Sequence, residues 1–223
     1  MIDMASVDLG IDLGTATVVV YDSTQGIVLK EPSVVAINTK TDEVLSVGEE
    51  AYRMLGRTPD KIRAVRPLQD GVISDFNSTE KMIQSFLRKV GGNQIIRPRV
   101  AICVPSGITE VESRAVVDAA VAAGARKVYL IEEPVAAALG AGIDISKPNG
   151  HIIVDIGGGT TDIAVLSLNG VVCKTSLKVA GDKFDQAIVR YVRSTYDVLI
   201  GEKMAERLKM EIGSVFLDRK SVV

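Results

Sequence analysis

The chain has 223 residues, of which 47% are hydrophobic and 24% charged, and its formal net charge at pH 7 is −2. This length and apolar content suit one large globular domain or two small ones. The nearly balanced charge offers no general attraction to nucleic acid. One histidine and two cysteines are too few to form a metal site built from histidine and cysteine ligands.

Neither a membrane span nor a secretion signal is expected. No apolar run approaches the roughly 18 residues that cross a bilayer, and the start, MIDMASVD, lacks the basic and apolar regions of a signal peptide. Cys103 and Cys173 both fall in strand-like apolar runs. We therefore expect a soluble cytoplasmic protein whose two thiols are buried and free.

The first predicted element is a hairpin at residues 10–21. A strand leads into Asp12, a turn follows at Gly14, Thr15, Ala16 and Thr17, and apolar residues then return as a second strand. Short strands are predicted next at 27–29, 34–37 and 44–47. The charged stretch at 49–75 contains two prolines, and we expect it to be irregular.

An amphipathic helix is predicted after this stretch. Asn77 with Glu80 three residues later indicates its start, and Gly91 and Gly92 indicate its end. Its apolar positions share one face at helical spacing: Met82, Ile83, Phe86, Leu87 and Val90.

The loop NQIIRPR at residues 93–99 has two interpretations. Ile95 and Ile96 could enter the next strand, or they could be the apolar tip of a loop that touches a membrane. In the second case Arg97 and Arg99 would lie near anionic headgroups.

Two strand-helix units are predicted beyond this loop. A strand at 100–104 precedes a helix whose capping box is Thr109 and Glu112. A strand at 128–131 brings Glu132 and Glu133 to the start of another helix, with Pro134 at its first position. On the residues alone, the two carboxylates could simply complement the helix dipole.

A second strand-turn-strand element occupies residues 152–168, with the sequence IIVDIGGGTTDIAVLSL. Asp155 precedes a turn made of Gly157, Gly158, Gly159 and Thr160. Successive glycines let backbone N–H groups approach an anion closely, as in a phosphate-binding nest. A Walker loop is disfavoured, because no lysine follows and the next segment alternates like a strand.

The two turns share an aspartate two residues before a glycine. We expect them to grip one polyphosphate from opposite sides, with Asp12 and Asp155 holding a hydrated Mg²⁺ between them. A glycine hairpin without a ligand is the alternative for either turn alone. The last predicted elements are a strand at 171–177 and helices at 183–196 and 202–212.

Several motifs resemble those of the actin, sugar kinase and heat-shock chaperone ATPase superfamily. In this chain, DLGTAT at 12–17 and DIGGGTTD at 155–162 resemble the two phosphate motifs of the superfamily. The segment EEPVAAALGAG at 132–142 resembles its connecting helix. Four further segments resemble the MreB/Mbl family of bacterial actins: KEPSVVAI at 30–37, VGEEA at 47–51, RPLQDGVISDF at 66–76 and AGDKFD at 180–185.

This resemblance implies an α/β, actin-like ATPase fold with ribonuclease H-like lobes, each a mixed sheet flanked by helices. The first lobe would be complete at residues 1–149, with a small insertion subdomain at about 32–76. Residues 150–223 would begin a second, partial lobe. The family's chains continue further, so an open adenosine pocket, weakened nucleotide binding and exposed apolar faces are expected.

The resemblance also implies roles for individual residues. Glu133 would orient the attacking water with help from Thr160, and Glu132 would support it. Gly181 and Asp182 would lie near the sugar and phosphates. Glu206 and Lys209 would face the adenosine, although on the residues alone they form a plain surface ion pair. Ile95 and Ile96 would contact the membrane.

The implied function is slow, Mg-dependent ATP hydrolysis coupled to filament assembly. The partners would be further copies of the chain, the inner face of the cytoplasmic membrane and the cell-wall synthesis machinery, which the filaments would organise to maintain rod shape. The alternatives are a plasmid-segregating or cell-division actin, a chaperone ATPase, and a sugar or acetate kinase.

Overall fold

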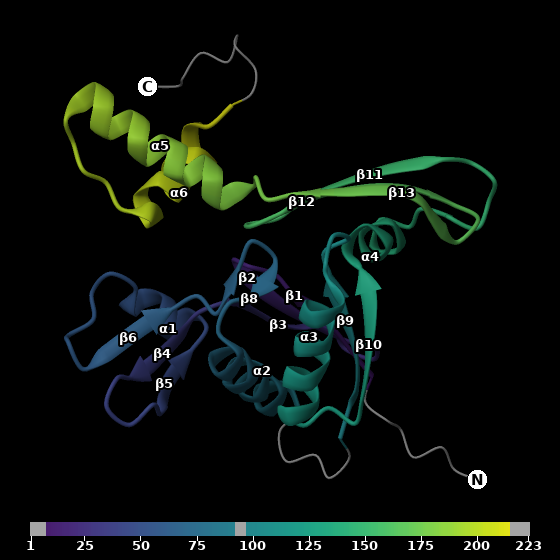
Figure 1. Cartoon of the computed structure of the whole chain (residues 1–223), viewed down its shortest axis with the longest axis horizontal. Coiled ribbons are helices and arrows are strands. Elements are labelled where there is room, and N and C mark those ends of the chain that lie inside the picture. The colour runs from purple at the N-terminus through teal and green to yellow at the C-terminus, as the bar shows by residue number, and fades with distance from the viewer. Residues whose placement is uncertain (1–7, 92–96, 215–223) are drawn as a thin grey trace. The chain divides into compact units, whose positions relative to one another are not determined.

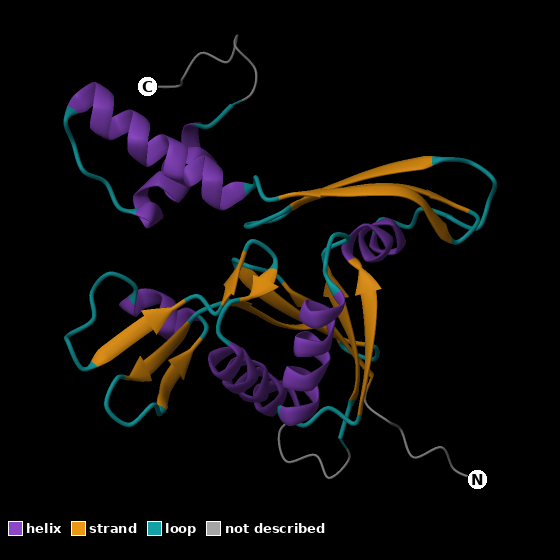
Figure 2. Cartoon of the chain, viewed as in Figure 1, coloured by secondary structure: helices purple, strands orange, loops and turns teal. Residues whose placement is uncertain are grey.

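The computed structural model describes residues 8–91 and 97–214. Its contacts divide the chain into two compact units, residues 1–178 and residues 179–223. Figures 1 and 2 show the elements of each unit. The predicted lobe boundary after residue 149 lies within the first of these units and stays a prediction.

A five-stranded sheet is the centre of the first unit. β1, β2 and β3 form an antiparallel meander, and β9 and β10 continue the sheet beyond β1 in parallel, giving the order β10-β9-β1-β2-β3. The strands are β1 (Asp8–Leu13), β2 (Thr17–Asp22), β3 (Gly26–Pro32), β9 (Arg99–Val104) and β10 (Lys127–Glu132).

Two helices, α2 (Phe76–Gly91) and α3 (Glu110–Ala122), lie side by side against this sheet (Figure 1). The predicted apolar face of α2 is largely buried in the core, where Met82 and Phe86 are among the fully buried side chains. Alternate residues of β1 and β2, such as Leu9 and Val20, complete the same core.

The starts of these two helices were predicted with different success. The capping box of α3 is confirmed, because the Thr109 hydroxyl accepts from the Glu112 N–H and the Thr109 N–H donates to Glu112 Oε2. The start of α2 was misplaced. Asp75 caps it by accepting from the N–H and hydroxyl of Ser78, so the predicted Asn77 lies inside the helix.

The expectation of an irregular 49–75 region was wrong. It contains α1 (Glu49–Met54), β6 (Ile62–Val65), β7 (Leu68–Gln69) and β8 (Val72–Ile73). β4 (Val35–Asn38) pairs with both β5 (Val44–Val47) and β6, in the order β5-β4-β6. Ala51 of α1 packs on Val34 and Ala36. β6 depends on pairing with β4, which is distant in sequence, so a short local pattern could not reveal it.

The predicted glycine-rich element at 152–168 is part of a three-stranded antiparallel sheet: β11 (His151–Ile156), β12 (Thr161–Ser167) and β13 (Gly170–Leu177). Helix α4 (Glu133–Gly140) packs on one face of this sheet, where Ala138 meets Ala164 and Leu166. The described residues leave the other face open, and Ile152 and Val154 are exposed there.

Both cysteines are free, but their environments differ from the prediction. Cys103 is half-buried in β9, whereas Cys173 is exposed on β13. Cys173 lies opposite Val165, which lies opposite Ile152, so its side chain belongs to the open face of the three-stranded sheet. A buried Cys173 was therefore wrong, because an apolar strand does not show which of its faces is covered.

The described part of the second unit contains two helices, α5 (Gly181–Tyr196) and α6 (Glu202–Ile212). Ala205 of α6 is fully buried. The Asp185 carboxylate is buried beside Lys209, with 2.9 Å between Nζ and Oδ1. Among the residues that the structure describes, no helix is long and apolar enough to span a membrane.

Candidate nucleotide-binding site

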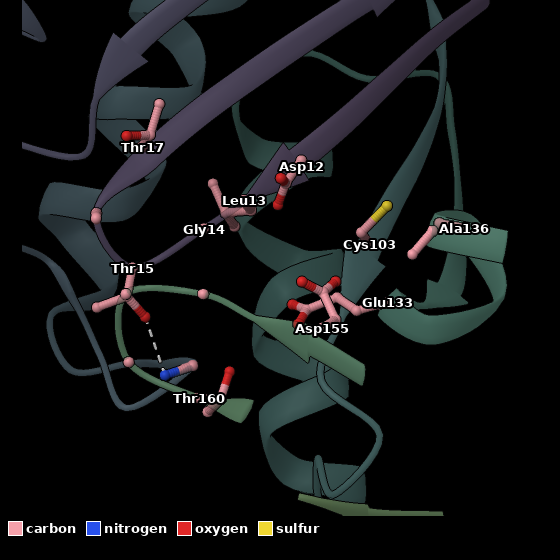
Figure 3. Close-up of a pocket in the computed structure, with 16 residues that line it drawn as sticks. Asp12, Leu13, Gly14, Thr15, Thr17, Cys103, Glu133, Ala136, Asp155 and Thr160 are labelled. Atoms are coloured by element: carbon pink, nitrogen blue, oxygen red, sulfur yellow. Dashed lines mark hydrogen bonds between the residues drawn. The ribbon is translucent and has the colours of Figure 1, made fainter. Parts of the chain in front are cut away.

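The two glycine turns lie at one cavity of about 550 Å³ in the first unit (Figure 3). The β1–β2 turn forms one wall, the β11–β12 turn forms another, and the start of α4 forms a third. The lining residues include Asp12, Gly14, Thr15, Ala16, Thr17, Glu133, Asp155, Gly157, Gly158, Gly159 and Thr160. The structure thus brings both predicted phosphate turns together, while their ligand remains a prediction.

The close approach of the two turns explains why the second is rich in glycine. A Cβ atom on Gly158 would lie 2.8 Å from the Ala16 Cβ, and one on Gly159 would lie 2.7 Å from Thr15 Oγ1. Contacts this short do not occur in folded proteins, so side chains here would push the turns apart. The turn itself is closed by a 2.9 Å hydrogen bond from the Gly157 N–H to the Thr160 carbonyl.

A third loop, which the sequence analysis missed, contacts both turns. This is the tip of the β7–β8 hairpin, where the Gly71 N–H donates to Thr15 Oγ1 at 3.1 Å and the Asp70 backbone lies 3.0 Å from the Cβ position of Gly159. Asp70 and Gly71 both have positive φ, 50° and 77°. The Asp-Gly pair was the available signal, since it is typical of a tight hairpin turn.

Three carboxylates point toward one another in the cavity: Asp12 from β1, Asp155 from β11 and Glu133 from the first turn of α4 (Figure 3). Burial, followed by the charge of Asp155, raises the pKa of Asp12. Burial, followed by the charge of Asp162, raises the pKa of Asp155. Burial raises the pKa of Glu133 to about 8, with further contributions from Asp162, Asp12 and Asp155.

The raised pKa values of these carboxylates indicate that the cavity would bind a cation. None of the described residues that line it is a lysine or arginine, so the carboxylates lack a cation from the lining itself. No group of three or more His, Cys, Asp or Glu side chains among the described residues could hold a metal ion directly. Mg²⁺ keeps most of its waters and needs one or two carboxylates, and Asp12 with Asp155 fits that requirement.

The remaining predicted residues lie elsewhere. Gly181, Asp182, Glu206 and Lys209 belong to α5 and α6 in the second unit. Lys209 contacts Asp185, a buried residue to which the sequence analysis gave no role, and donates to the Gly181 carbonyl at 3.4 Å. Ile95 and Ile96 lie outside the described residues, so their predicted membrane contact stays a prediction.

The fold defines a class, the actin-like ATPases. A structure of MreB5 of Spiroplasma citri bound to ADP is 43% identical, with a TM-score of 0.90 over 96% of this chain and 65% of that one. A structure of the same protein bound to AMPPNP is 42% identical, with a TM-score of 0.87 over 97% and 65% of the two chains.

The family follows from the sequence. The family model of the MreB/Mbl protein matches residues 6–222, so this chain belongs to the MreB/Mbl family. The cell shape-determining protein MreB of Escherichia coli K12 is 56% identical over 219 residues, which are 96% of this chain. The chain spans 63% of the length of that relative.

Proposed function

We propose that this chain binds Mg-ATP in the cavity between its two glycine turns and hydrolyses it slowly. The observation that carries the proposal is the meeting of two turns, far apart in sequence, with Asp12, Asp155 and Glu133 at one cavity. The ADP and AMPPNP bound by the Spiroplasma relative support a nucleotide as the ligand.

Positioning and charge neutralisation would do most of the work, since phosphoryl transfer needs little covalent help. The backbone N–H groups of the two turns would cradle the phosphates. Asp12 and Asp155 would hold Mg²⁺ through its waters, and the bound ion would neutralise phosphate charge. Glu133 would orient the attacking water, with help from the Thr160 hydroxyl.

Four further residues would contact the nucleotide, as the family resemblance implies. Gly181 and Asp182 would lie near the sugar and phosphates, and Glu206 and Lys209 would face the adenosine. We place the boundary between the two lobes after residue 149, between the five-stranded and three-stranded sheets, with the insertion subdomain at about 32–76.

We further propose that hydrolysis is coupled to filament assembly with other copies of the chain. The nucleotide would join two lobes, so its state would set the subunit shape that a filament accepts. The filaments would lie in the cytoplasm and organise cell-wall synthesis. The name of the Escherichia coli relative, a cell shape-determining protein, supports this role in cell shape. Ile95 and Ile96 would attach them to the inner face of the membrane.

Replacing Glu133 tests the proposal. Glu133→Ala should keep nucleotide affinity but slow phosphate release by about 10² to 10³, or roughly 2.7 to 4 kcal/mol, the usual effect of removing one positioned catalytic group. Isothermal titration with ADP and AMPPNP gives the affinity, and a phosphate-release assay with Mg-ATP gives the turnover.

Glu110→Ala is the matched control, because Glu110 is an acidic residue in the first turn of α3, as Glu133 is in α4, but Glu110 is exposed and does not line the cavity. A general loss of helix-dipole complementarity would affect both variants. Parental turnover in Glu133→Ala would sink the catalytic assignment. If the chain transferred phosphate from ATP to a small acceptor molecule, a kinase would be favoured. If the chain sedimented equally with and without ATP, the coupling of hydrolysis to filament assembly would be contradicted.

A further inference from the structure

Two side-chain contacts join the five-stranded sheet to the three-stranded sheet next to the cavity. Lys174 of β13 contacts Glu132 at the end of β10, with 2.8 Å between Nζ and Oε1. Asp162 of β12 accepts a 2.7 Å hydrogen bond from the N–H of Ser106, which follows β9. Each contact links the carboxyl end of a strand in the five-stranded sheet to a strand of the three-stranded sheet.

Glu132 does not use its carboxylate in the way its position suggests. It is the N-cap residue of α4, where a side chain normally accepts from the N–H groups of the first turn, but it makes no such bond. Its Oε1 contacts Lys174, and its Oε2 is buried without a hydrogen-bond partner among the described residues. Lys174 therefore fixes the direction of this carboxylate.

The residue that follows Glu132 is Glu133, so the same contact also fixes the start of α4. Further along the helix, Ala138 packs on Ala164 and Leu166 of β12. Helix α4 is thus attached to the three-stranded sheet by apolar packing along the helix and by Lys174 at Glu132, the N-cap residue before its first turn. The three-stranded sheet, which carries Asp155 and the second turn, therefore determines where the Glu133 side chain lies in the cavity.

We propose that Lys174, acting through Glu132, is a positioning residue that holds Glu133 in place for ATP hydrolysis. This inference rests on the proposed function. It assigns Lys174 a role in turnover although the residue does not line the cavity.

An ordinary surface ion pair is the competing explanation. The side chains of Lys174 and Glu132 are 42% and 31% exposed, and pairs of this kind contribute little to the stability of a fold. The two explanations differ in what they predict. A surface pair would leave turnover unchanged, whereas a positioning pair would slow turnover without weakening nucleotide binding, because displacements of about 1 Å can slow a reaction by about 10².

The experiment compares Lys174→Met, which keeps the length of the side chain, with Lys174→Arg, which keeps the charge. We would measure the single-turnover rate constant with bound Mg-ATP and, separately, the dissociation constants for ADP and AMPPNP. Lys147→Met is the matched control, since Lys147 forms a 3.1 Å ion pair with Asp144 at a distance from the cavity. Thermal melts followed by circular dichroism report whether each variant is folded.

We expect Lys174→Met to slow the single turnover by roughly tenfold or more, with unchanged dissociation constants, and Lys174→Arg to restore most of the rate. The charge-swapped pair Glu132→Lys with Lys174→Glu should recover part of it. A parental rate in Lys174→Met, or an equal loss in Lys147→Met, would overturn this inference alone. A parent chain that binds no nucleotide or never hydrolyses it would overturn the proposed function, and this inference with it.

Discussion

The two glycine hairpins share one local pattern but differ in their surroundings. In the first hairpin, β1 has a strand on each side, and Leu9, three residues before Asp12, is 3% exposed. In the second hairpin, β11 is an edge strand of the three-stranded sheet, and the equivalent Ile152, three residues before Asp155, is 71% exposed. Both hairpins nevertheless bring an aspartate to the same cavity.

A turn can therefore be placed at the cavity whether or not the strand before it is buried. The first hairpin lies in the main hydrophobic core and contributes strongly to it. The second is held at the cavity mainly by backbone pairing, by α4 and by contacts of its own turn. The two copies should therefore respond differently to equivalent substitutions.

The largest difference is expected in stability. Leu9→Ala should lower the free energy of unfolding by about 2 to 5 kcal/mol, because it leaves a cavity in a close-packed core. Ile152→Ala at the equivalent position should change it by less than about 0.5 kcal/mol, because that side chain is already in solvent. Urea unfolding followed by circular dichroism measures both. Equal losses would show that the open face of the second sheet is covered in solution.

A slightly smaller effect is expected in nucleotide binding. Gly159→Ala should weaken the binding of ADP and AMPPNP by about 10², or roughly 2.7 kcal/mol, because the new methyl group would collide with Thr15 and the Asp70 backbone. Gly150→Ala is the control, because Gly150 precedes β11 and does not line the cavity. A Cβ there lies 3.8 Å from the Val165 Cγ1, an ordinary contact, so its affinity should stay close to the parental value in calorimetric titrations. If Gly159→Ala binds equally well, the turns do not need to approach as closely as described.

The smallest of the three effects is a pH dependence of stability. The pKa of Glu133 is raised from its ordinary value of 4.5 to about 8 in the folded chain. Between these values the folded chain keeps the proton that the unfolded chain loses, so the stabilising contribution is complete below about pH 4.5 and is lost as the pH rises through about 8. The raised pKa values of Asp12 and Asp155 act in the same direction.

Without nucleotide, the free energy of unfolding should therefore fall on going from pH 5 to pH 8, with Glu133 contributing on the order of 2 kcal/mol after allowance for solvent in the cavity. Glu133→Gln should flatten this slope, and the exposed Glu110→Gln should not. Chemical unfolding at several pH values provides the test. An unchanged slope in Glu133→Gln would mean that the carboxylate is ionised in the folded chain.

The elements that the sequence predicted correctly are those whose signals are local. Both glycine turns, the capping box at Thr109 and the start of α4, which lies one residue before the predicted Pro134, each depend on residues within a few positions of one another. The two turns also share a pattern, which was enough to predict that they lie together at one cavity.

What the sequence did not reveal depends on partners distant in the chain. β6 exists because it pairs with β4, and the β7–β8 tip reaches the cavity through Thr15, 56 residues before Gly71. The exposure of Cys173 follows from the absence of a covering layer on one face of its sheet among the described residues. No pattern within a strand carries that information.

The parallel pairing of β1 with β9 also has a consequence for the order in which the chain folds. The bidentate contact between Asp8 and Arg99 joins residues 91 positions apart, whereas the β11, β12 and β13 strands follow one another directly. During synthesis from the N-terminus, the β1–β2–β3 meander emerges long before β9 does. Until residue 104 has left the ribosome, the edge of β1 is open to pairing with a strand of another nascent chain, while the later three-stranded sheet can close almost as soon as it emerges.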